Sequence, residues 1–264
     1  REDALRSLSG KSLNAGQQAS ATMVISSNSR FSAVQGTAGT GKTTMLKEAK
    51  NLAESAGYRM VGIAPSAAAA RELQKAGIES QTIAAFVNRE QSGLSDKAIL
   101  ILDEAGMVSA KDMLSVLDRV DQASARAVLV GDVQQLKAIE AGKPFAQLQE
   151  AGIQRVEMGE IMRQSNAELR HAVELAASGE AARSIDLLQR HVVEIERYSD
   201  RHLAIARDFA GLPPSLRENT LILAGTHSAR TAINENVRVE LGLSGQGISV
   251  SALERKDMTE VQSR

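Results

Sequence analysis

The sequence contains no cysteine and no tryptophan among its 264 residues, and aromatic residues make up only 2% of it. Without cysteine the chain has no disulfides, no thiol nucleophile and no thiolate metal ligand, a composition that fits a reducing cytoplasm. With so few aromatic residues, the hydrophobic core has to be built from Ala, Leu, Ile, Val and Met. We therefore expect an aliphatic core and a cytoplasmic location.

Net charge and long apolar runs are also scarce. The formal net charge is −1, so any binding to nucleic acid would depend on a local groove and not on an overall positive field. No apolar run approaches the roughly 20 residues of a membrane-spanning helix, and the first residues lack the apolar core of a signal peptide. We therefore predict no membrane insertion. Because the sequence opens at Arg1, we also expect it to be part of something longer.

The most informative stretch, residues 34–44, reads VQGTAGTGKTT and fits the pattern G-x-x-x-x-G-K-[ST]. Small residues let the backbone curl around a polyphosphate, so that successive N–H groups point at the phosphate oxygens. Lys42 would reach the outer phosphates, and the Thr43 hydroxyl would bind Mg²⁺. The candidate cofactor-binding residues of this loop are Gly36, Thr37, Ala38, Gly39, Thr40, Gly41, Lys42, Thr43 and Thr44.

The segments on either side of this loop are those that a phosphate-binding loop requires, a strand before it and a helix after it. Residues 31–34 predict a short buried strand, and residues 43–55 predict a helix with one apolar face. A helix that begins here directs the partial positive charge of its N-terminus toward a bound phosphate. The alternative is a glycine-rich turn with a chance lysine, which the strand before and the helix after argue against.

A pair of carboxylates follows residues 97–102 (KAILIL), an apolar run that predicts a strand buried on both faces. A nucleoside triphosphatase needs one carboxylate to hold Mg²⁺ through water, and a second to orient and deprotonate the attacking water. We assign the first role to Asp103 and the second to Glu104. An acidic pair on the surface at a strand end is the alternative, and the phosphate loop upstream weighs against it.

Two more polar residues follow in the order that such a site requires. Gln135 comes after a predicted strand at residues 127–130, where an amide can hydrogen-bond the γ-phosphate or its attacking water. Arg163 lies in the sequence GEIMRQ, and a guanidinium there would stabilise the charge of the transition state. Taken alone, Gln135 fits a polar turn and Arg163 a solvated side chain, so their weight comes from what precedes them.

Strands and helices alternate along the first 155 residues. The strands are predicted at residues 31–34, 58–64, 97–102 and 127–130. This alternation is typical of a doubly wound parallel α/β sheet, in which ligands bind at the carboxyl ends of the strands. A helix with Asn14 as its predicted N-cap precedes the first strand, Ser66 is a predicted N-cap of a later helix, and residues 81–88 form a short helix or strand.

The pattern changes after about residue 155. Helices are predicted at residues 158–176, 180–190, 202–209 and 228–241, a buried strand at 219–224, and a candidate strand at 192–195. The strand and helix near the end indicate the start of a second α/β unit. We therefore divide the chain into one domain of residues 1–155 and a second, incomplete domain of residues 156–264.

The order of these motifs resembles that of superfamily 1 helicases, closest to the 5′→3′ branch that includes RecD. Within that branch the chain is similar to the helicase part of conjugative relaxases of the TraI/TrwC type. The likeness rests on LNAGQQA, GTAGTGKTT, APSAAAARELQ, QTIAAFV, ILILDEAGMVS, VLVGDVQQL, MGEIMRQ and NTLILAGTHSARTAINENVR, and IEAGKPF adds to the relaxase likeness. These segments extend from about residue 13 to about residue 240.

The resemblance implies a RecA-like fold, ATP and Mg²⁺ as cofactors, and single-stranded DNA as partner, together with other domains of a relaxase and its transfer machinery. It assigns adenine recognition to Gln17, with Gln18 as second choice. It supports the roles given above to Lys42, Thr43, Asp103, Glu104, Gln135 and Arg163. It places Pro65, Ser66, Gln81 and Thr82 at positions that contact the DNA backbone.

The sequence departs from the family pattern in several places. Ser66 replaces the more usual threonine, and residues 67–70 lack the glycine and basic residue often found there. The last two motor motifs, the relaxase tyrosine and its histidine cluster do not occur before residue 264. Phe86 is the lone aromatic residue near the DNA-side motifs, and a core position explains it better than base stacking does.

The resemblance therefore predicts an ATP-driven motor domain that moves on single-stranded DNA during conjugative transfer. A nucleotide-dependent module that binds single-stranded DNA without unwinding is the alternative. A P-loop kinase is a third reading, which the Asp103–Glu104 pair disfavours because it points to water as the acceptor.

Overall fold

The structure is a computed structural model that describes residues 12–37, 39–133, 142–160 and 166–246. The chain divides into two compact units, residues 1–188 and residues 189–264. The domain boundary at residue 155, which we placed where the sequence pattern changes, remains a prediction. None of the described helices is long and apolar enough to cross a membrane.

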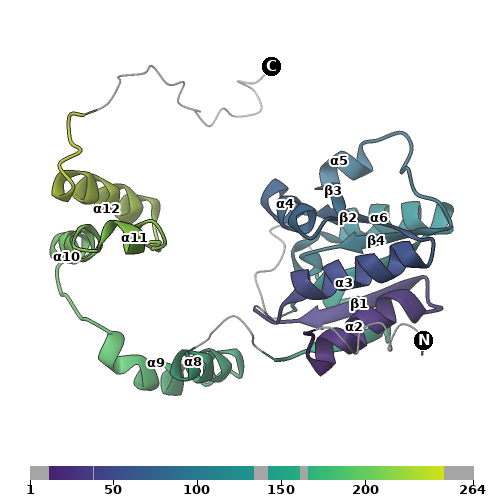
Figure 1. Ribbon diagram of the computed structural model, residues 1–264, viewed down its shortest axis with the longest axis horizontal. Coiled ribbons are helices and arrows are strands. Elements are labelled where there is room, and N and C mark those ends of the chain that lie inside the picture. Colours follow the sequence, from purple (N-terminus) through teal and green to yellow (C-terminus); the bar gives the residue numbers. More distant parts are fainter. Residues whose placement is uncertain (1–11, 38, 134–141, 161–165, 247–264) are drawn as a thin grey trace. The chain divides into compact units, whose positions relative to one another are not determined.

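One sheet of parallel strands organises the described part of the first unit (Figure 1). Its strands are β1 (Phe31–Gly36), β2 (Arg59–Ala64), β3 (Glu79–Thr82), β4 (Ala98–Leu102), β5 (Arg126–Gly131) and β6 (Gln154–Met158). They lie in the order β3-β2-β4-β5-β1-β6, and every pairing is parallel. Central strand β4 is buried at all of its residues, as a strand covered on both faces must be. The predicted parallel α/β sheet is confirmed.

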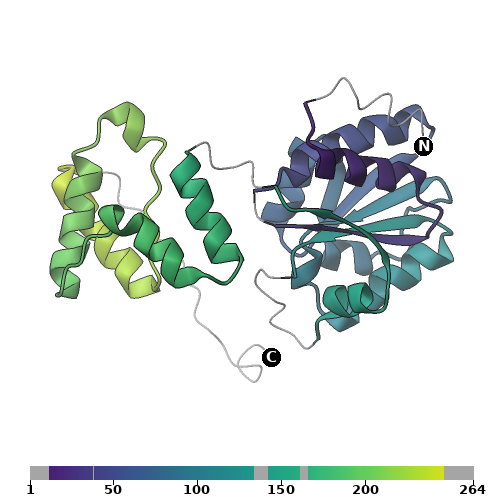
Figure 2. The same cartoon turned by 90° about the horizontal axis from the view of Figure 1, so that it is seen from below.

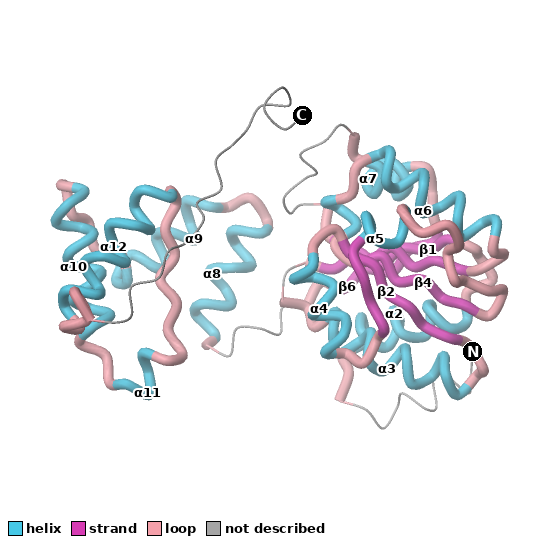
Figure 3. The backbone as a smooth tube through the Cα atoms, turned by 90° about the horizontal axis from the view of Figure 1, so that it is seen from above, coloured by secondary structure: helices cyan, strands magenta, loops and turns pink. Residues whose placement is uncertain are grey.

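Helices cover both faces of this sheet (Figures 2 and 3). One face carries α2 (Ala15–Ser26), α3 (Lys42–Ser55) and α4 (Ala67–Lys75). The other carries α5 (Ile83–Val87), the 3-10 turn η1 (Ala105–Met107), α6 (Ala110–Gln122) and α7 (Pro144–Glu150). The two core layers are almost entirely aliphatic, and Phe86 and Phe145 are the fully buried aromatic side chains of the described core.

Side-chain caps start the helices directly after the strands. Ser66 accepts a hydrogen bond from Ala69 N at 3.1 Å, and Thr82 accepts one from Ala85 N at 3.2 Å. Each oxygen satisfies a backbone donor that the first turn of a helix leaves unpaired. Thr82 is at once the last residue of β3 and the cap of α5, so residues 81–88, expected to be helix or strand, contain both.

Two elements near the end of the sheet differ from the sequence prediction. A helix was expected from residue 158, but Gln154–Met158 forms strand β6, and the next helix, α8, begins at Ala167. Edge strand β6 is mostly exposed and gains its structure from pairing with β1, where Gln35 lies opposite Glu157. Such tertiary pairing overrides a weak local preference. Helix α7 was not predicted at all.

The remaining described elements are helical. They are α8 (Ala167–Ala177) and α9 (Ala181–Leu188) in the first unit, and η2 (Gln189–His191), α10 (Tyr198–Ala210), α11 (Pro214–Arg217) and α12 (His227–Glu240) in the second. Helices α8 and α9 pack together, and Ser184 Oγ donates to the carbonyl oxygen of Ala172 at 2.8 Å. Helices α10 and α12 also pack together, joined by Arg207 and Glu240 at 3.2 Å.

The strand predicted at residues 219–224 is wrong. Asn219 and Thr220 close a turn after α11, residues 221–224 form no strand, and Leu221 and Leu223 are 82% and 83% exposed. A strand needs a neighbouring strand to satisfy its N–H and C=O groups, and the described residues of the second unit supply none. Residues 192–195 lack strand structure for the same reason, with Val193 80% exposed.

Candidate nucleotide-binding site

The predicted phosphate loop connects β1 to α3, with a strand before and a helix after it as expected. Gly39 and Gly41 have φ angles of 81° and 77°, a left-handed conformation that glycine adopts without strain. A Cβ atom on Gly36 would lie 3.1 Å from Thr40 Oγ1 and 3.2 Å from Lys42 Cδ. The loop therefore curls tightly enough to bring its backbone close to an anion. Ala38 lies outside the described residues.

The polar groups of the loop are turned inward. Lys42 Nζ donates to the carbonyl oxygens of Gly36 at 2.7 Å and of Thr37 at 3.5 Å. The Thr37 hydroxyl is buried without a hydrogen-bond partner in the described structure. Thr43 and Thr44 are exposed in the first turn of α3. An orphaned hydroxyl beside a lysine and a helix N-terminus suits a phosphate group, and the exposed Thr43 hydroxyl can meet a metal ion bound to it.

Gln17 lies against this loop and is only 4% exposed. Its Nε2 donates to the carbonyl oxygen of Thr40 at 3.0 Å, and its Oε1 accepts from Asn14 N at 3.0 Å. Asn14 is the N-cap of α2, as predicted, and completes a capping box with Gln17. Gln18, the second choice for adenine recognition, instead donates to the carbonyl oxygen of Leu13 at 2.9 Å. Both parts of the Gln17 amide are thus engaged within the protein.

Asp103 follows the last residue of buried strand β4. Its backbone N–H donates to the carbonyl oxygen of Ile63, and its Oδ1 accepts from Glu104 N at 2.9 Å. The pKa of the Asp103 carboxyl is raised to about 6, mainly because the group is buried; the Glu104 N–H opposes this rise, the Glu104 carboxylate adds to it, and the Lys42 charge opposes it. Lys42 and Asp103 are therefore within electrostatic reach of each other. A carboxylate that is costly to ionise without a cation is well suited to hold Mg²⁺.

Glu104 begins the turn η1 in a left-handed conformation with φ of 52°. Residues other than glycine rarely adopt this conformation, and holding one in it costs on the order of 1 kcal/mol. The conformation is fixed because Met107 N donates to the Glu104 carbonyl oxygen at 2.9 Å. Backbone strain at an acidic residue directly beside Asp103 is typical of a functional position.

Two glycines, which the sequence reading did not single out, let the ends of β4 and β5 touch. A Cβ atom on Gly106 would lie 2.6 Å from the carbonyl oxygen of Asp132. One on Gly131 would lie 3.0 Å from the backbone nitrogens of Ala105 and Gly106. The turn that carries Glu104 therefore packs backbone to backbone on the segment that leads to Gln135.

Gln35, also missed, connects the strand before the phosphate loop to the same segment. Its Nε2 donates to Asp132 Oδ1 at 3.0 Å, and its Oε1 accepts from Val133 N at 3.3 Å. The same oxygen accepts from Gln149 Nε2 at 3.1 Å, and Gln149 Oε1 accepts from Arg155 Nη1 at 3.1 Å. The sequence signal that could have identified Gln35 is a polar residue at an inward-facing position of a strand. Gln135 and Arg163 lie outside the described residues.

The residues assigned to DNA contact lie together at one edge of the sheet. Pro65 and Ser66 follow the end of β2, and Gln81 and Thr82 end the adjacent strand β3, where Thr82 is paired with Ala64. Strand β2 also pairs with β4, so the Asp103 end of β4 lies along the same edge. The Ser66 and Thr82 hydroxyls are used as helix caps.

The parallel sheet, the phosphate loop and the carboxylates at the strand ends define a P-loop nucleoside triphosphatase fold, which implies binding of a nucleotide, typically with Mg²⁺. A family model described as an AAA domain matches residues 12–196, and the chain belongs to this family. Its relatives include proteins of conjugation and a helicase.

The chain is 36% identical over 241 residues to a conjugal transfer protein TraA of Rhizobium radiobacter, covering 88% of this chain and 22% of that protein. It is 29% identical to the multifunctional conjugation protein TraI of Escherichia coli K12, covering 89% of this chain and 16% of that protein. It is 33% identical to the ATP-dependent RecD2 DNA helicase of Deinococcus radiodurans, covering 52% of this chain and 20% of that protein.

These relatives confirm the resemblance to the superfamily 1 helicase region of TraI/TrwC-type proteins. The chain spans about a fifth of the length of the conjugation proteins that it matches. It is therefore a helicase-like P-loop domain of the kind found in conjugation proteins.

Proposed function

We propose that the chain is the ATP-binding and ATP-hydrolysing motor domain of a cytoplasmic helicase that translocates on single-stranded DNA within a conjugative relaxase-helicase. One continuous set of contacts carries this proposal. Gln35, next to the phosphate loop, bonds to Asp132, and Asp132 packs on the turn that holds Glu104. The phosphate loop and the water-activating carboxylate are thereby joined in one rigid edge of the sheet.

Each residue has a distinct task in the proposed reaction. The loop N–H groups and Lys42 bind the β- and γ-phosphates of ATP. Thr43 and Asp103 would hold Mg²⁺, which neutralises phosphate charge when bound. Glu104 orients the attacking water and accepts its proton, and Gln135 hydrogen-bonds the γ-phosphate or the water. Arg163 stabilises the charge of the transition state.

DNA binding is assigned to the edge of the sheet formed by β2 and β3. Pro65, Ser66, Gln81 and Thr82 would contact the backbone of a single strand, beside the carboxylate end of β4. A change of state at the nucleotide then reaches the DNA-contacting residues through neighbouring strand ends. Single-stranded DNA, the other domains of a relaxase and the transfer machinery are the proposed partners.

The second unit would contribute to a second motor domain. Residues 219–224 precede α12, whose N-cap Thr226 accepts from Ala229 N at 3.1 Å. Strand β2 leads into α4 through Ser66 in the same way.

The test is the affinity for a non-hydrolysable ATP analogue with Mg²⁺, measured with and without a single-stranded oligonucleotide. Lys42→Ala should lose most of the affinity, whereas Glu104→Gln should bind ATP and fail to hydrolyse it. Tight binding by Lys42→Ala would overturn the site. If the oligonucleotide changes nucleotide affinity, linkage requires an equal reciprocal change in DNA affinity.

A nucleotide-dependent module that binds single-stranded DNA without unwinding is the second candidate. It is favoured by the second unit, in which the described elements are helices and form no sheet. Reciprocal coupling without hydrolysis by the wild-type chain, and with no effect of Glu104→Gln, would select this candidate. The P-loop kinase reading remains disfavoured, because Glu104 is held beside Asp103 where an attacking water would lie.

A further inference from the structure

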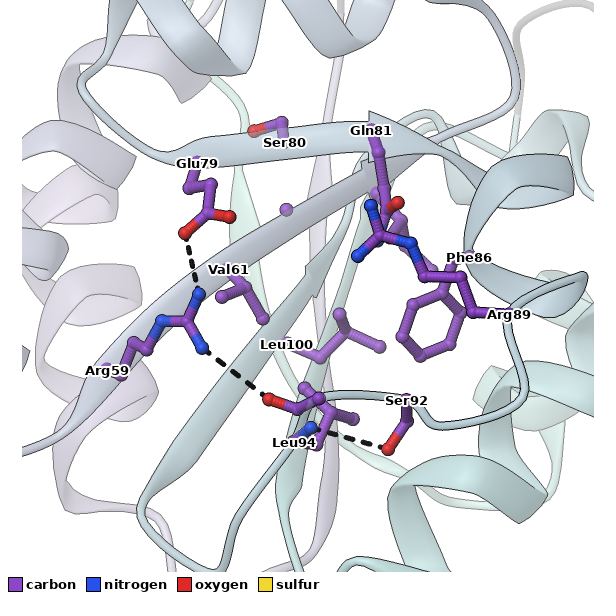
Figure 4. Close-up of a pocket in the computed structure, with 13 residues that line it drawn as sticks. Arg59, Val61, Glu79, Ser80, Gln81, Phe86, Arg89, Ser92, Leu94 and Leu100 are labelled. Atoms are coloured by element: carbon purple, nitrogen blue, oxygen red, sulfur yellow. Dashed lines mark hydrogen bonds and ion pairs between the residues drawn. The ribbon is translucent and has the colours of Figure 1, made fainter.

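A cavity of about 130 Å³ lies on the sheet between β2, β3 and β4, apart from the phosphate loop (Figure 4). Its walls combine apolar residues, among them Val61, Leu94, Leu100 and Phe86, with polar and charged ones. Gln81, one of the residues assigned to DNA contact, lies at one end of it. A hollow of roughly 150 Å³ lined by apolar side chains holds one benzene molecule. This cavity therefore has the volume of a single six-membered ring.

The polar groups of the cavity are unevenly satisfied. The Gln81 Oε1 atom is buried and accepts no hydrogen bond in the described structure. Leaving a buried acceptor unpaired is costly, so Gln81 is prepared for a donor that a ligand brings. At the other end of the cavity, Arg59 is already occupied: it pairs with Glu79 at 2.6 Å and reaches the carbonyl oxygen of Gly93 at 3.5 Å.

The charge at the mouth comes from Arg89, whose side chain extends toward Gln81 (Figure 4). Arg89 is exposed, and its guanidinium has no hydrogen-bond or ion-pair partner among the described residues. Its backbone is fixed, because the Arg119 guanidinium donates to the Arg89 carbonyl oxygen at 2.8 Å. A cation beside an unpaired buried acceptor favours a ligand that carries both an N–H donor and a negative charge.

We propose that this cavity receives a pyrimidine-sized nucleobase turned out of the bound DNA strand, with its N–H donating to Gln81 Oε1 and the adjoining phosphate pairing with Arg89. The inference rests on the proposed function, which places the strand at this edge. Thr82 and Ser66 lie one step away along β3 and at the end of the adjacent β2, so the backbone of the strand stays at the edge while the base enters the hollow. A free pyrimidine nucleotide has the same chemistry and is the source to distinguish.

The experiment compares oligothymidylate with a strand of equal length and charge whose sugars carry no bases, both measured by fluorescence anisotropy. Gln81→Met keeps the length of the side chain but removes the acceptor. We expect it to weaken binding of the base-bearing strand by about 3- to 10-fold, the value of one hydrogen bond, and to leave the abasic strand unchanged. Val61→Phe, which fills the cavity, should have the same selective effect.

Two charge variants separate the base from the phosphate. Arg89→Gln should weaken binding of both strands and lower the salt dependence, because the guanidinium contacts phosphate. Arg170→Gln, which removes an exposed charge from α8, is the matched control and should change neither strand. Equal losses on both strands for Gln81→Met would overturn the proposal, because Gln81 would then contact the backbone alone.

Failure of the proposed DNA-binding function would give results different from failure of the base site alone. If the wild-type chain binds neither strand, the assignment of DNA binding falls together with this inference. If it binds both strands equally and Gln81→Met has no effect, DNA binding stands and the base site is wrong. If thymidine monophosphate binds in a manner that depends on Gln81 and the strands show no base dependence, the cavity belongs to a free nucleotide and the strand assignment is overturned.

Discussion

Gln17 Nε2 donates a hydrogen bond to the carbonyl oxygen of Thr40 at 3.0 Å, across 23 positions of the chain. Because Oε1 of the same amide completes the capping box of α2 through Asn14 N, the start of α2 and the phosphate loop are held by one side chain. Contact of Gln17 with an adenine would require the amide to share or exchange one of these partners. The conformation of the loop and recognition of the base are therefore coupled.

Gln17→Ala should weaken ATP binding by about tenfold, a value typical of one lost buried hydrogen bond with its cap. Part of this loss should also appear for inorganic tripolyphosphate, which has no adenine, because the bond to Thr40 supports the loop itself. Calorimetric titration with both ligands measures the two contributions, and Gln18→Ala is the control on the neighbouring residue. A loss confined to ATP would show that Gln17 acts on the base alone.

Asp103→Asn should stabilise the nucleotide-free protein at neutral pH while abolishing hydrolysis. Since folding raises the pKa of Asp103 from 3.8 to about 6, the folded state binds more protons than the unfolded state between these values. The cost of the ionised carboxyl is therefore absent below about pH 4, grows up to about pH 6 and is complete above it, at on the order of 1–3 kcal/mol.

Denaturant unfolding without Mg²⁺ at about pH 8 and about pH 4 tests this sign. The stability gain of Asp103→Asn should be present at the higher pH and vanish at the lower one. Glu90→Gln, a change at an exposed carboxyl, should show no such difference. A gain that is independent of pH would contradict the burial of a charge at Asp103.

Gly106→Ala should lower both stability and hydrolysis. The added methyl group would lie 2.6 Å from the Asp132 carbonyl oxygen, so the turn that holds Glu104 must move away from β5, at a cost of about 1–3 kcal/mol. Gly159→Ala is the matched control, since nothing lies within 4 Å of its Cβ position. Thermal unfolding and steady-state hydrolysis measure the two effects, and a Gly106→Ala protein that behaves like Gly159→Ala would refute the close approach.

Gln35→Leu should separate binding from catalysis. Its hydrogen bonds reach Asp132 and Val133 and do not reach the loop, so we expect nucleotide affinity to change by less than about threefold while the turnover rate falls by about tenfold. Gln147→Leu, on the exposed side of α7, is the control. Combining Gln35→Leu with Gln149→Leu should add little further loss, because the two amides share one bond.

The sequence predicted those features that are encoded locally. The phosphate loop has a fixed spacing, and β4 is apolar at every residue, so both were found with their flanking elements. Strand β6 was missed because pairing with β1, and not its own composition, makes it a strand. Residues 219–224 have the composition of a buried strand and lack the neighbour that would make them one.

The candidate site shows the same division. Asp103, Glu104 and the loop were identified from spacing, whereas Gln35 and Gly106 matter through neighbours about 100 and 26 positions away in the chain. No local pattern reports such partners. The hydrogen bond from Gln17 to the phosphate loop likewise depends on a contact between α2 and residues that follow β1.

The phosphate loop binds its own lysine, Lys42, through a backbone carbonyl oxygen. Lys42 Nζ is already bonded to the Gly36 carbonyl oxygen at 2.7 Å, so an arriving phosphate competes with this partner for the ammonium group. The Gly36 carbonyl oxygen therefore competes with the phosphate for Lys42. Because it belongs to the same chain as Lys42, this competition does not weaken on dilution. Its opposition matters least for a triphosphate, which offers the most negative charge, and most for a diphosphate that has lost its γ-phosphate. In the proposed ATPase, the resting loop would thereby favour release of the nucleoside diphosphate.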